Sequence, residues 1–409
     1  MSYLIDWPQV TVNCKSANLK CMREPMYGSD LSNVVFHVHS PIEAEVLRPL
    51  VDCQQEELFA AQADIAPIGL NLYFPANPGS GYAELIKREL GLYAARLQQR
   101  TLTKTWFRGS PLTALKAGEL TELAFHTNLL FSHDTSDDRE CGFECAIGDV
   151  TPQSLALMKG LRFDHILLCL ETMIPPNKQG VAERLPLIDE YQLQNQRYRL
   201  DVKHTDPDTL DCWLEVLLEH HPEMLEIQGL EKMDDPLPLA SLVRQFKSHQ
   251  YQLVGDRFFV PDRHALLQLR QRQNLRYMPW GLCQRQLSDW PGVGVGALGK
   301  LGSGYYQNTE SIDRYRDALY HDQLPVCCSG TYPKEGKIIP FHDLVDQLLC
   351  QHRIVVSEGS KDSQQSQGAN GRISRLRAAG WMEPSEDGLL ITERGLNHLP
   401  ELCQVLQQG

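Results

Sequence analysis

The sequence predicts an α/β protein in which a parallel sheet, open or closed into a partial barrel, precedes a smaller C-terminal domain. Through the first three quarters of the 409 residues, short apolar runs alternate with amphipathic stretches, which is the pattern of βαβ units. From Pro291 the sequence is glycine-rich, and it then changes into a helix, strand, strand, helix pattern. Because parallel α/β folds carry function at the carboxyl ends of their strands, we expect the site there.

Seven segments are predicted as strands from their apolar or alternating composition. They cover residues 34–40, 68–74, 103–107, 142–147, 164–170, 198–204 and 224–230. Between them, residues 82–100 and 112–131 carry apolar side chains at three- and four-residue spacing, which predicts helices. The alternation of these two kinds of segment is the reason to expect a parallel sheet.

Two helix starts are marked by side chains that can cap a helix. Thr151 precedes Pro152, so we predict an N-cap followed by proline at the first helical position. Asp208 or Thr209 is predicted to cap the helix that carries Trp213.

The chain divides into three predicted parts. An N-terminal arm covers residues 1–32, the α/β barrel covers 33–300, and the C-terminal domain covers 301–409. In the last part, residues 357–371 are polar and low in complexity, and we predict a mobile loop there. The helix, two short strands around an acidic turn and second helix that follow have the pattern of a winged helix.

Composition argues against several classes of function. The net charge of −13 disfavours a surface that follows nucleic-acid phosphates, because such a surface needs clustered Lys and Arg. No window approaches the roughly eighteen uninterrupted apolar residues of a membrane span, and the N-terminus lacks the features of a signal peptide. We therefore expect a cytoplasmic protein that binds no nucleic acid and has no membrane span.

The twelve cysteines are unevenly spaced, and we predict reduced thiols rather than a disulfide framework. Cys327 and Cys328 are adjacent, so their side chains point apart. Cys141 and Cys145 lie on a predicted strand, where this offset separates them by about 13 Å. No metal site is predicted at either pair.

From about residue 33 to the C-terminus, the segments follow the order of one known family. The family motif VHIP corresponds to VHSP, with His39 and Pro41 in place, and a glycine-rich strand with a Gln-Asn pair corresponds to GVGVGALGKLGSGYYQN. On these residues the chain resembles the oxygen-independent coproporphyrinogen III oxidases and related haem chaperones, which are radical S-adenosylmethionine (SAM) proteins of haem biosynthesis. The resemblance implies a partial (β/α) radical-SAM-type barrel with a C-terminal helical and winged-helix domain.

The family's cluster motif is missing from the matched positions. The family carries C-x3-C-x2-C after its first strand, and the three positions here hold Glu43, Leu47 and Leu50. If LYFP at 72–75 were the first strand instead, no cysteine would follow it before Cys141. Because a four-iron cluster needs thiolate ligands, we expect no cofactor other than haem or a related tetrapyrrole.

The family's cosubstrate turn has also changed. The motif GGGTPT corresponds to residues 107–112, where Phe107 and Arg108 replace glycines, and we expect these bulky side chains to obstruct the cosubstrate. The resemblance assigns to this degenerate pocket Phe107, Arg108, Gly109, Ser110, Glu144, Glu171, Asp201, Gly294 and Gly296.

Some residues are candidates for contacts to a retained ligand. They are His37, His39, Arg108, Gln307 and Asn308. The two histidines could be ligands at the barrel mouth or hydrogen-bonded core residues. Arg108 could clamp a propionate, or it could fill the old pocket by pairing with Glu144 or Glu171. The sequence leaves both choices open.

We therefore predict a coproporphyrinogen III oxidase-like pseudoenzyme that binds or handles haem or another carboxylate-bearing tetrapyrrole, or regulates a partner protein. One alternative is an active oxidoreductase of porphyrin metabolism, either with an unorthodox iron–sulfur site or with acid–base chemistry at Glu144, Glu171 and Asp201. The other alternative is an interaction scaffold whose cavity is filled by side chains such as Phe107 and Arg108.

Overall fold

The computed structural model describes residues 48–49, 66–97, 100–133, 139–178, 180–193, 195–230, 233, 238–278, 280–284, 289–302, 304–331, 348–355, 373–385, 388–399 and 402. The predicted arm at 1–32, strand at 34–40 and loop at 357–371 lie outside these residues. The candidate residues His37, His39, Glu43, Leu47 and Leu50 also lie outside them.

A curved sheet forms the centre of the described structure, in the order β13-β2-β3-β5-β6-β7-β8-β10-β9, with β4 beside β3. Neighbouring strands from β13 to β8 are parallel, and β10 and β9 extend the sheet antiparallel. The strands are β2 (Ile68–Phe74), β3 (Thr101–Gly109), β4 (Ser132–His133), β5 (Glu140–Ala146), β6 (His165–Glu171), β7 (Asn195–Asp201), β8 (Met224–Gln228), β9 (Tyr251–Val254), β10 (Phe258–Pro261) and β13 (Gly292–Val293).

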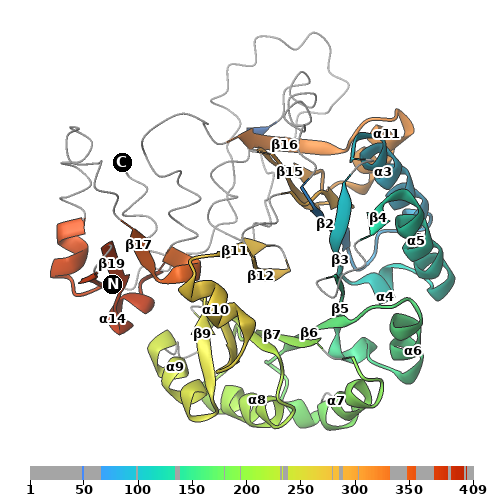
Figure 1. The fold of residues 1–409 in the computed structure, drawn as a ribbon. Helices are drawn as coiled ribbons and strands as arrows, with labels where there is room; N and C mark the ends of the chain where they lie inside the picture. The colour runs from blue at the N-terminus through green and yellow to red at the C-terminus, as the bar shows by residue number, and fades with distance from the viewer. Residues whose placement is uncertain are drawn as a thin grey trace, which may run out of the picture.

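Helices cover the outer side of this sheet. They are α3 (Tyr82–Leu97), α4 (Pro111–Ala114), α5 (Ala117–Leu130), α6 (Pro152–Gly160), α7 (Val181–Glu190), α8 (Pro207–Glu219) and α9 (Leu239–Ser248), with single turns at Ile147–Asp149 and Pro176–Lys178. Helix α10 (Ala265–Gln271) packs on the opposite face of β9 and β10, where Leu266 and Leu267 join Val254 and Phe258. Figure 1 shows β2 to β7 along the inside of an arc and α5 to α8 along its outside. The predicted α/β fold with a parallel, partly closed sheet is confirmed.

Strand β2 shows why the sheet has an apolar outer face and a polar inner face. Every second residue from Ile68 to Phe74 is fully buried, and the ring of Phe74 packs edge-on against Tyr82 of α3. The alternate residues Asn71 and Tyr73 point to the inner side, where they line a pocket. Since successive strand side chains point to opposite faces, this period of two separates the helix-facing core from the barrel interior.

The helix starts agree with the sequence at one position and differ at another. Thr151 caps α6, because its hydroxyl accepts a hydrogen bond from the amide of Ser154, as predicted. The predicted cap of α8 at Asp208 or Thr209 is wrong, because Asp206 caps that helix and Pro207 occupies its first position. Proline is favoured at the first helical position, so the cap moves to the residue before it.

The predicted helix at 112–131 is divided into two. The short α4 ends at Leu115, whose backbone is extended at φ −129° and ψ 145°. A new helix, α5, starts after Lys116, and the side chain of Glu119 accepts a hydrogen bond from the Lys116 amide. This local cap restarts the helix in a new direction, which apolar spacing alone does not reveal.

Smaller sheets complete the described chain. The first joins β1 (Arg48–Pro49), β16 (Val326–Thr331), β15 (Gly304–Asn308) and β14 (Leu298–Leu301), and α11 (Ile312–Tyr320) connects β15 to β16. The second joins β11 (Leu275–Met278) and β12 (Gly281–Gln284). The third joins β17 (Arg353–Val355), β19 (Gly388–Ile391) and β18 (Met382–Ser385).

Near the C-terminus, the elements follow the predicted order. A helical segment over 373–378 precedes β18 and β19, and α14 (Glu393–Leu396) follows them. The hydroxyl of Thr392 caps α14 by accepting from the Gly395 amide. The winged-helix interpretation and the domain boundaries remain predictions. No helix within the described ranges combines the length and apolar character needed to cross a membrane.

Candidate ligand-binding site

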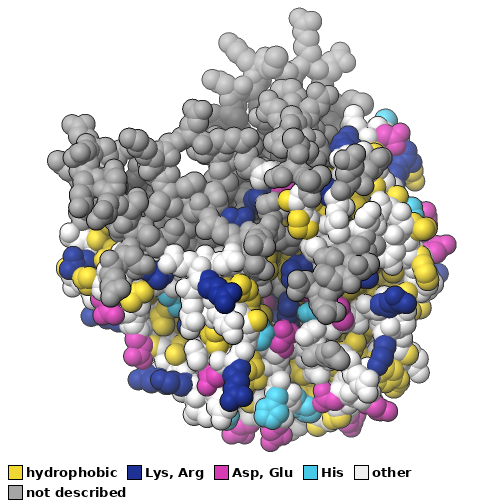
Figure 2. Space-filling view, viewed as in Figure 1, with side chains coloured by type: hydrophobic (Ala, Val, Ile, Leu, Met, Phe, Trp, Pro, Cys, Tyr) yellow, Lys and Arg dark blue, Asp and Glu magenta, His cyan; other side chains and the backbone are white. Residues whose placement is uncertain are grey.

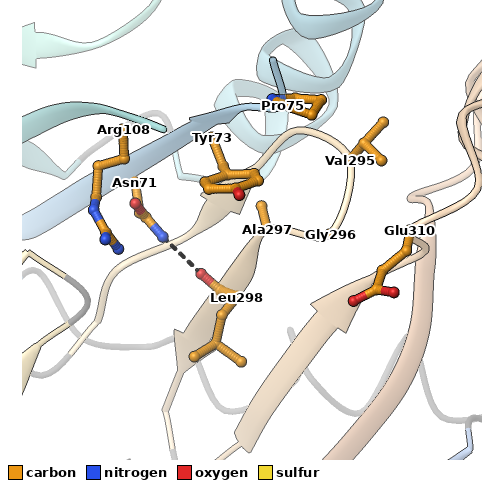
Figure 3. A pocket seen from close by; sticks show the side chains of 9 residues that line it. All are labelled: Asn71, Tyr73, Pro75, Arg108, Val295, Gly296, Ala297, Leu298 and Glu310. Atoms are coloured by element: carbon orange, nitrogen blue, oxygen red, sulfur yellow. Dashed lines mark hydrogen bonds between the residues drawn. The ribbon is translucent and has the colours of Figure 1, made fainter. Parts of the chain in front are cut away.

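A pocket of about 210 Å³ opens where β2 and β3 end. Its walls come from these strands and from the segments next to β14 and β15. The residues that line it are Asn71, Tyr73, Pro75, Arg108, Val295, Gly296, Ala297, Leu298 and Glu310 (Figure 3). The pocket lies at the carboxyl ends of parallel strands, as expected for a site in this fold. Because sites for drug-sized ligands measure about 300–1,000 Å³, this pocket suits a small molecule or one arm of a larger one.

Glycines shape the pocket wall. Gly294 has φ +114°, and a Cβ atom there would lie 2.2 Å from the carbonyl oxygen of Tyr73. Gly109 has φ +82°, and its Cβ would lie 2.4 Å from the carbonyl oxygen of Phe74. Both positions therefore require glycine, for backbone conformation and for close approach. Of the glycines assigned from the resemblance, Gly296 lines the pocket itself.

A buried carboxylate, Glu89 of α3, holds this wall from behind. Glu89 is fully buried and accepts hydrogen bonds from the Gly294 amide at 2.8 Å, from Asn308 Nδ2 at 2.7 Å and from the Tyr315 hydroxyl. Burial raises the pKa of Glu89 to about 8, although these three hydrogen bonds act in the opposite direction. One carboxyl group thus ties α3, β15 and α11 to the glycine loop.

Gln307 and Asn308, two of the candidate ligand contacts, belong to the same support. Gln307 Nε2 donates to the carbonyl of Gly296 at 3.3 Å, and Asn308 Nδ2 also donates to the carbonyl of Gly294 at 2.9 Å. Neither residue is part of the pocket lining. In this structure they shape the loop that a ligand would meet, instead of facing the ligand themselves.

Arg108 is the charged group of the pocket that is most fully buried. Its side chain is 3% exposed, and its Nε donates to Glu144 Oε2 at 3.0 Å. Among the described residues, Nη1 of Arg108 and Oδ1 of the neighbouring Asn71 have no hydrogen-bond partner (Figure 3). Asn71 is itself held in place, since its Nδ2 donates to the carbonyl of Leu298 at 3.1 Å. A buried donor and a buried acceptor are therefore available to a ligand.

Glu144 connects Arg108 to a chain of ion pairs across the barrel interior. Arg199 of β7 donates from Nη1 to Glu144 Oε1 at 2.9 Å and from Nε to Glu226 Oε2 of β8 at 2.7 Å. The thiol of Cys169 on β6 also lies 3.3 Å from Glu144 Oε1. Burial would raise the pKa of Glu144, but the guanidinium groups of Arg108 and Arg199 outweigh it and lower the pKa to about 2. Glu144 is therefore ionised at neutral pH.

A second group of charges lies nearer the amino ends of the same strands. Glu140 of β5 pairs with Lys104 of β3 and with Arg197 of β7, and it accepts a hydrogen bond from the indole of Trp106 at 2.7 Å. The guanidinium of Arg197 also lies over the Trp106 ring, 5.2 Å from its centroid. Burial opposes ionisation of Glu140, but Arg197 and Lys104 hold its pKa well below the usual value. The barrel interior is thus lined by paired charges.

The expectation that Phe107 obstructs the cosubstrate position is wrong for this structure. The Phe107 ring stacks on Phe74 with centroids 5.5 Å apart, and it contacts Phe163 edge-on at 5.1 Å and Phe143 at 6.4 Å. It therefore lies in the helix-facing core and does not line the pocket. Phe107 and Arg108 are consecutive strand residues, so only Arg108 can face the interior.

The three carboxylates proposed for acid–base chemistry do not meet in the pocket. Glu171 and Asp201 are paired in register at the ends of β6 and β7, where Glu171 is exposed and Asp201 pairs with Lys203 at 3.2 Å. Glu144 is held between two arginines, and none of the three lines the pocket. Ser110, also assigned to the pocket, instead precedes α4, and its amide donates to the Phe74 carbonyl at 2.8 Å.

Sequence reasoning missed several residues of the site. They are Asn71, Tyr73, Glu89, Arg199, Glu226 and Glu310. The signal for Asn71 was present, because it is a polar residue at the inward position of a strand that is otherwise apolar. Arg199 and Glu226 are charged residues inside buried strands, which is a second signal, since such charges need partners.

The strand that precedes β3 is β2, because β2, α3 and β3 form one parallel βαβ unit. This order agrees with the alternative in which the family's first strand corresponds to residues 72–75. The residues after β2, from Pro75 to Gly81, include no cysteine. Neither assignment of the first strand therefore supplies the three thiolates of the family motif.

A scan against protein-family models finds no match. The chain is 22% identical, over 80% of its length and 78% of the relative's, to an oxygen-independent coproporphyrinogen III oxidase from Pseudomonas aeruginosa. A shorter match, 30% identical over 88 residues, joins 22% of this chain to 19% of the Helicobacter pylori oxidase of the same name. Among solved structures, the coproporphyrinogen III oxidase of Escherichia coli, described as a radical SAM enzyme, has a TM-score of 0.73. It shares 16% sequence identity and covers 86% of this chain and 92% of its own.

The expectation that no cofactor other than a tetrapyrrole is involved is corrected by this similarity. The Escherichia coli protein with this fold is a radical SAM enzyme, a class whose chemistry depends on SAM and an iron–sulfur group. The matched residues do not fit that group at either loop, since Glu43, Leu47 and Leu50 and the residues after β2 provide no thiolate.

Proposed function

We propose that this chain, similar in sequence and fold to the oxygen-independent coproporphyrinogen III oxidases, binds a tetrapyrrole or another carboxylate-bearing molecule without carrying out the radical reaction. The similarity extends over 80% of the chain in sequence and 86% in structure. Its two parts, ligand binding and loss of the reaction, depend on different residues.

The main support for ligand binding is the position and hydrogen bonding of Arg108. Its guanidinium lies in the pocket wall, is fixed on one side by Glu144, and leaves Nη1 without a described partner. A planar guanidinium binds a carboxylate by two parallel hydrogen bonds, and such charge-assisted bonds are strong. Because coproporphyrinogen III, the compound in the relatives' names, carries carboxylate side chains, a pocket of about 210 Å³ suits one of these arms.

Loss of the radical reaction is supported by the residues at two family motifs. The cluster positions provide no thiolate, and Arg108 fills a position where the family turn has glycine. Glycine at such a turn allows the backbone to approach a ligand closely, whereas a buried ion pair occupies that space.

Two observations argue against acid–base chemistry at Glu144 and against a scaffold with a filled cavity. Acid–base chemistry at Glu144 would need a carboxyl group that titrates near neutral pH, but its pKa lies at about 2. An interaction scaffold with a filled cavity does not agree with the open pocket or with Phe107 packed among the helices.

The test is a titration with coproporphyrin III and with its tetra-amide, in which neutral amides of similar shape replace the four carboxylates. Wild-type protein is expected to bind the acid saturably and more tightly than the amide. Arg108→Gln removes one charge-assisted contact, about 1.5–3 kcal/mol, so its affinity for the acid should fall about tenfold to a hundredfold. Affinity for the amide should change little.

The matched control is Arg257→Gln. Arg257 is partly buried, with a side chain 21% exposed, and it pairs with a carboxylate, Asp256, at 2.7 Å, but it lies outside the pocket lining. The control should bind both porphyrins as wild type does. Absence of saturable binding to wild type, or equal losses in both variants, would refute the assignment of the site.

A further inference from the structure

We propose that Arg199, on β7 and outside the pocket lining, is a positioning residue that makes the pocket select ionised carboxylates, because it fixes Glu144 and through Glu144 fixes Arg108. This inference rests on the proposed function, in which Arg108 receives a carboxylate of the ligand. It assigns specificity to a residue that no ligand needs to touch.

The geometry gives each oxygen of Glu144 one arginine. Oε2 accepts from Arg108 Nε at 3.0 Å, and Oε1 accepts from Arg199 Nη1 at 2.9 Å. With both oxygens engaged, the carboxylate plane is held from two sides, so the guanidinium of Arg108 is bound along its Nε edge. Its Nη1 atom is then left without a described partner, in the wall of the pocket.

Arg199 is itself anchored on the far side. Its Nε donates to Glu226 Oε2 at 2.7 Å, and Glu226 Oε1 accepts from Gln228 Nε2 at 2.5 Å. The side chains of Arg199 and Glu226 are 13% and 7% exposed, so water screens these contacts weakly. The chain of contacts runs from β8 through β7 and β5 to β3, which are elements of one rigid sheet.

Charge balance explains why the loss of Arg199 would weaken the binding of a carboxylate. This row of ion pairs consists of two arginines, Arg108 and Arg199, and two carboxylates, Glu144 and Glu226. Its four charges therefore sum to zero before a ligand binds. Without Arg199, two buried carboxylates would share one guanidinium, and the excess negative charge would repel an anionic ligand.

Other groups around Glu144 do not replace Arg199. The Cys169 thiol contacts Glu144, but burial raises its pKa far above neutral, so it carries no charge. Burial likewise raises the pKa of the Tyr73 hydroxyl, so it is neutral as well. Arg199 is therefore the second cation on Glu144 among the described residues.

The pocket itself has a carboxylate, Glu310, which is exposed. Solvent weakens its effect on a bound anion, whereas Glu144 and Glu226 act from the buried side. Glu310 therefore opposes the binding of an anion less than a buried, unpaired carboxylate would.

The test measures selectivity, defined as the dissociation constant for coproporphyrin III tetra-amide divided by that for coproporphyrin III. Arg199→Gln should lower this ratio about tenfold, the value of one charge-assisted hydrogen bond, mostly through weaker binding of the acid. If Arg199 had a purely structural role, Arg199→Gln would weaken the binding of both porphyrins equally and leave this ratio unchanged.

Arg197→Gln is the matched control. Arg197 lies on the same strand, is similarly buried and pairs with a carboxylate, Glu140, but it does not contact Glu144. Its selectivity should stay within about twofold of wild type. If Arg199→Gln does not fold, the charge-balanced variant Arg199→Gln/Glu226→Gln tests the positioning contact by itself, because it removes the contact to Glu144 without adding net negative charge; its selectivity should also fall.

The outcomes separate this inference from the proposed function. If Arg108→Gln loses selectivity while Arg199→Gln or the double variant keeps it, the site stands and the role of Arg199 is refuted. If Arg197→Gln lost as much selectivity as Arg199→Gln, that role would also be refuted, because any change of charge in the barrel interior would then have the same effect. If wild type binds neither porphyrin, both proposals fall together.

Discussion

Replacement of Phe107 tests which way the residues of β3 face. The Phe107 side chain is 2% exposed and contacts the rings of Phe74, Phe143 and Phe163. Truncation of a buried phenylalanine costs about 3–5 kcal/mol, and each aromatic pair adds about 0.5–1.5 kcal/mol beyond burial. We therefore expect Phe107→Ala to lower the free energy of unfolding by about 3–5 kcal/mol. Phe107→Leu fills most of the space and should cost about 1–2 kcal/mol.

Urea denaturation followed by circular dichroism measures this loss, and porphyrin titration of the Phe107→Leu variant measures binding. Because Phe107 faces the helices, the dissociation constant for coproporphyrin III should stay within about twofold of wild type. Phe125→Ala is the control, since Phe125 on α5 is 61% exposed and its loss should change stability by less than about 0.5 kcal/mol. A loss below about 1 kcal/mol in Phe107→Ala, or a tenfold change in porphyrin affinity in Phe107→Leu, would refute the assigned orientation.

Three further replacements test the pocket support, the sheet interior and a helix cap. The folded pKa of Glu89 is about 8 against a usual 4.5, so stability should fall as pH rises between these values, by up to about 1.4 kcal/mol per unit. Urea denaturation at several pH values in that range should show this fall of stability with pH in wild type and not in Glu89→Gln. Equal slopes in the two proteins would contradict the raised pKa of Glu89. Gly142→Ala would place a Cβ 2.3 Å from the Trp106 ring and should lower the free energy of unfolding by about 1–3 kcal/mol, whereas wild-type stability would show that this contact is relaxed. Thr151→Ala should cost about 1 kcal/mol by the same measurement, and no loss would mean that the cap is dispensable.

The strands could be predicted from the sequence because their signal is local. A period of two, with apolar residues bounded by turns, located β2, β3, β5, β6, β7 and β8 within a few residues, whereas the two-residue strands β4 and β13 were not predicted. The helix boundaries were less accurate. The cap of α8 moved to Asp206 because Pro207 prefers the first helical position, and α5 restarts at a local cap beyond Lys116.

The site was predicted in part, because its chemistry depends on pairing between strands. The sequence identifies Arg108 and its partner Glu144. It does not show whether Arg108 binds a ligand carboxylate or only fills the former cosubstrate pocket. The structure shows both features, an ion pair along one edge and a pocket at the other. Arg199 and Glu226 could not be joined to them without the register of β7 and β8, which the sequence does not specify.

Phe107 shows an error that strand geometry could have prevented. It was grouped with Arg108 because both replace glycines of the family turn. On a strand, however, consecutive side chains point to opposite faces, so the two residues cannot both enter one pocket. The aromatic cluster that receives Phe107 joins β2, β3 and β5 to the segment before β6, which are distant in sequence.

The most direct test of the central claim is one incubation under anaerobic conditions. Protein reconstituted with iron and sulfide is mixed with SAM, a reductant and coproporphyrinogen III, and the decarboxylated product is measured beside the binding of coproporphyrin III to the same sample. We predict saturable binding that depends on Arg108, and no decarboxylated product. Product formed at the expense of SAM would contradict it and would mean that other residues of this chain support the family's reaction.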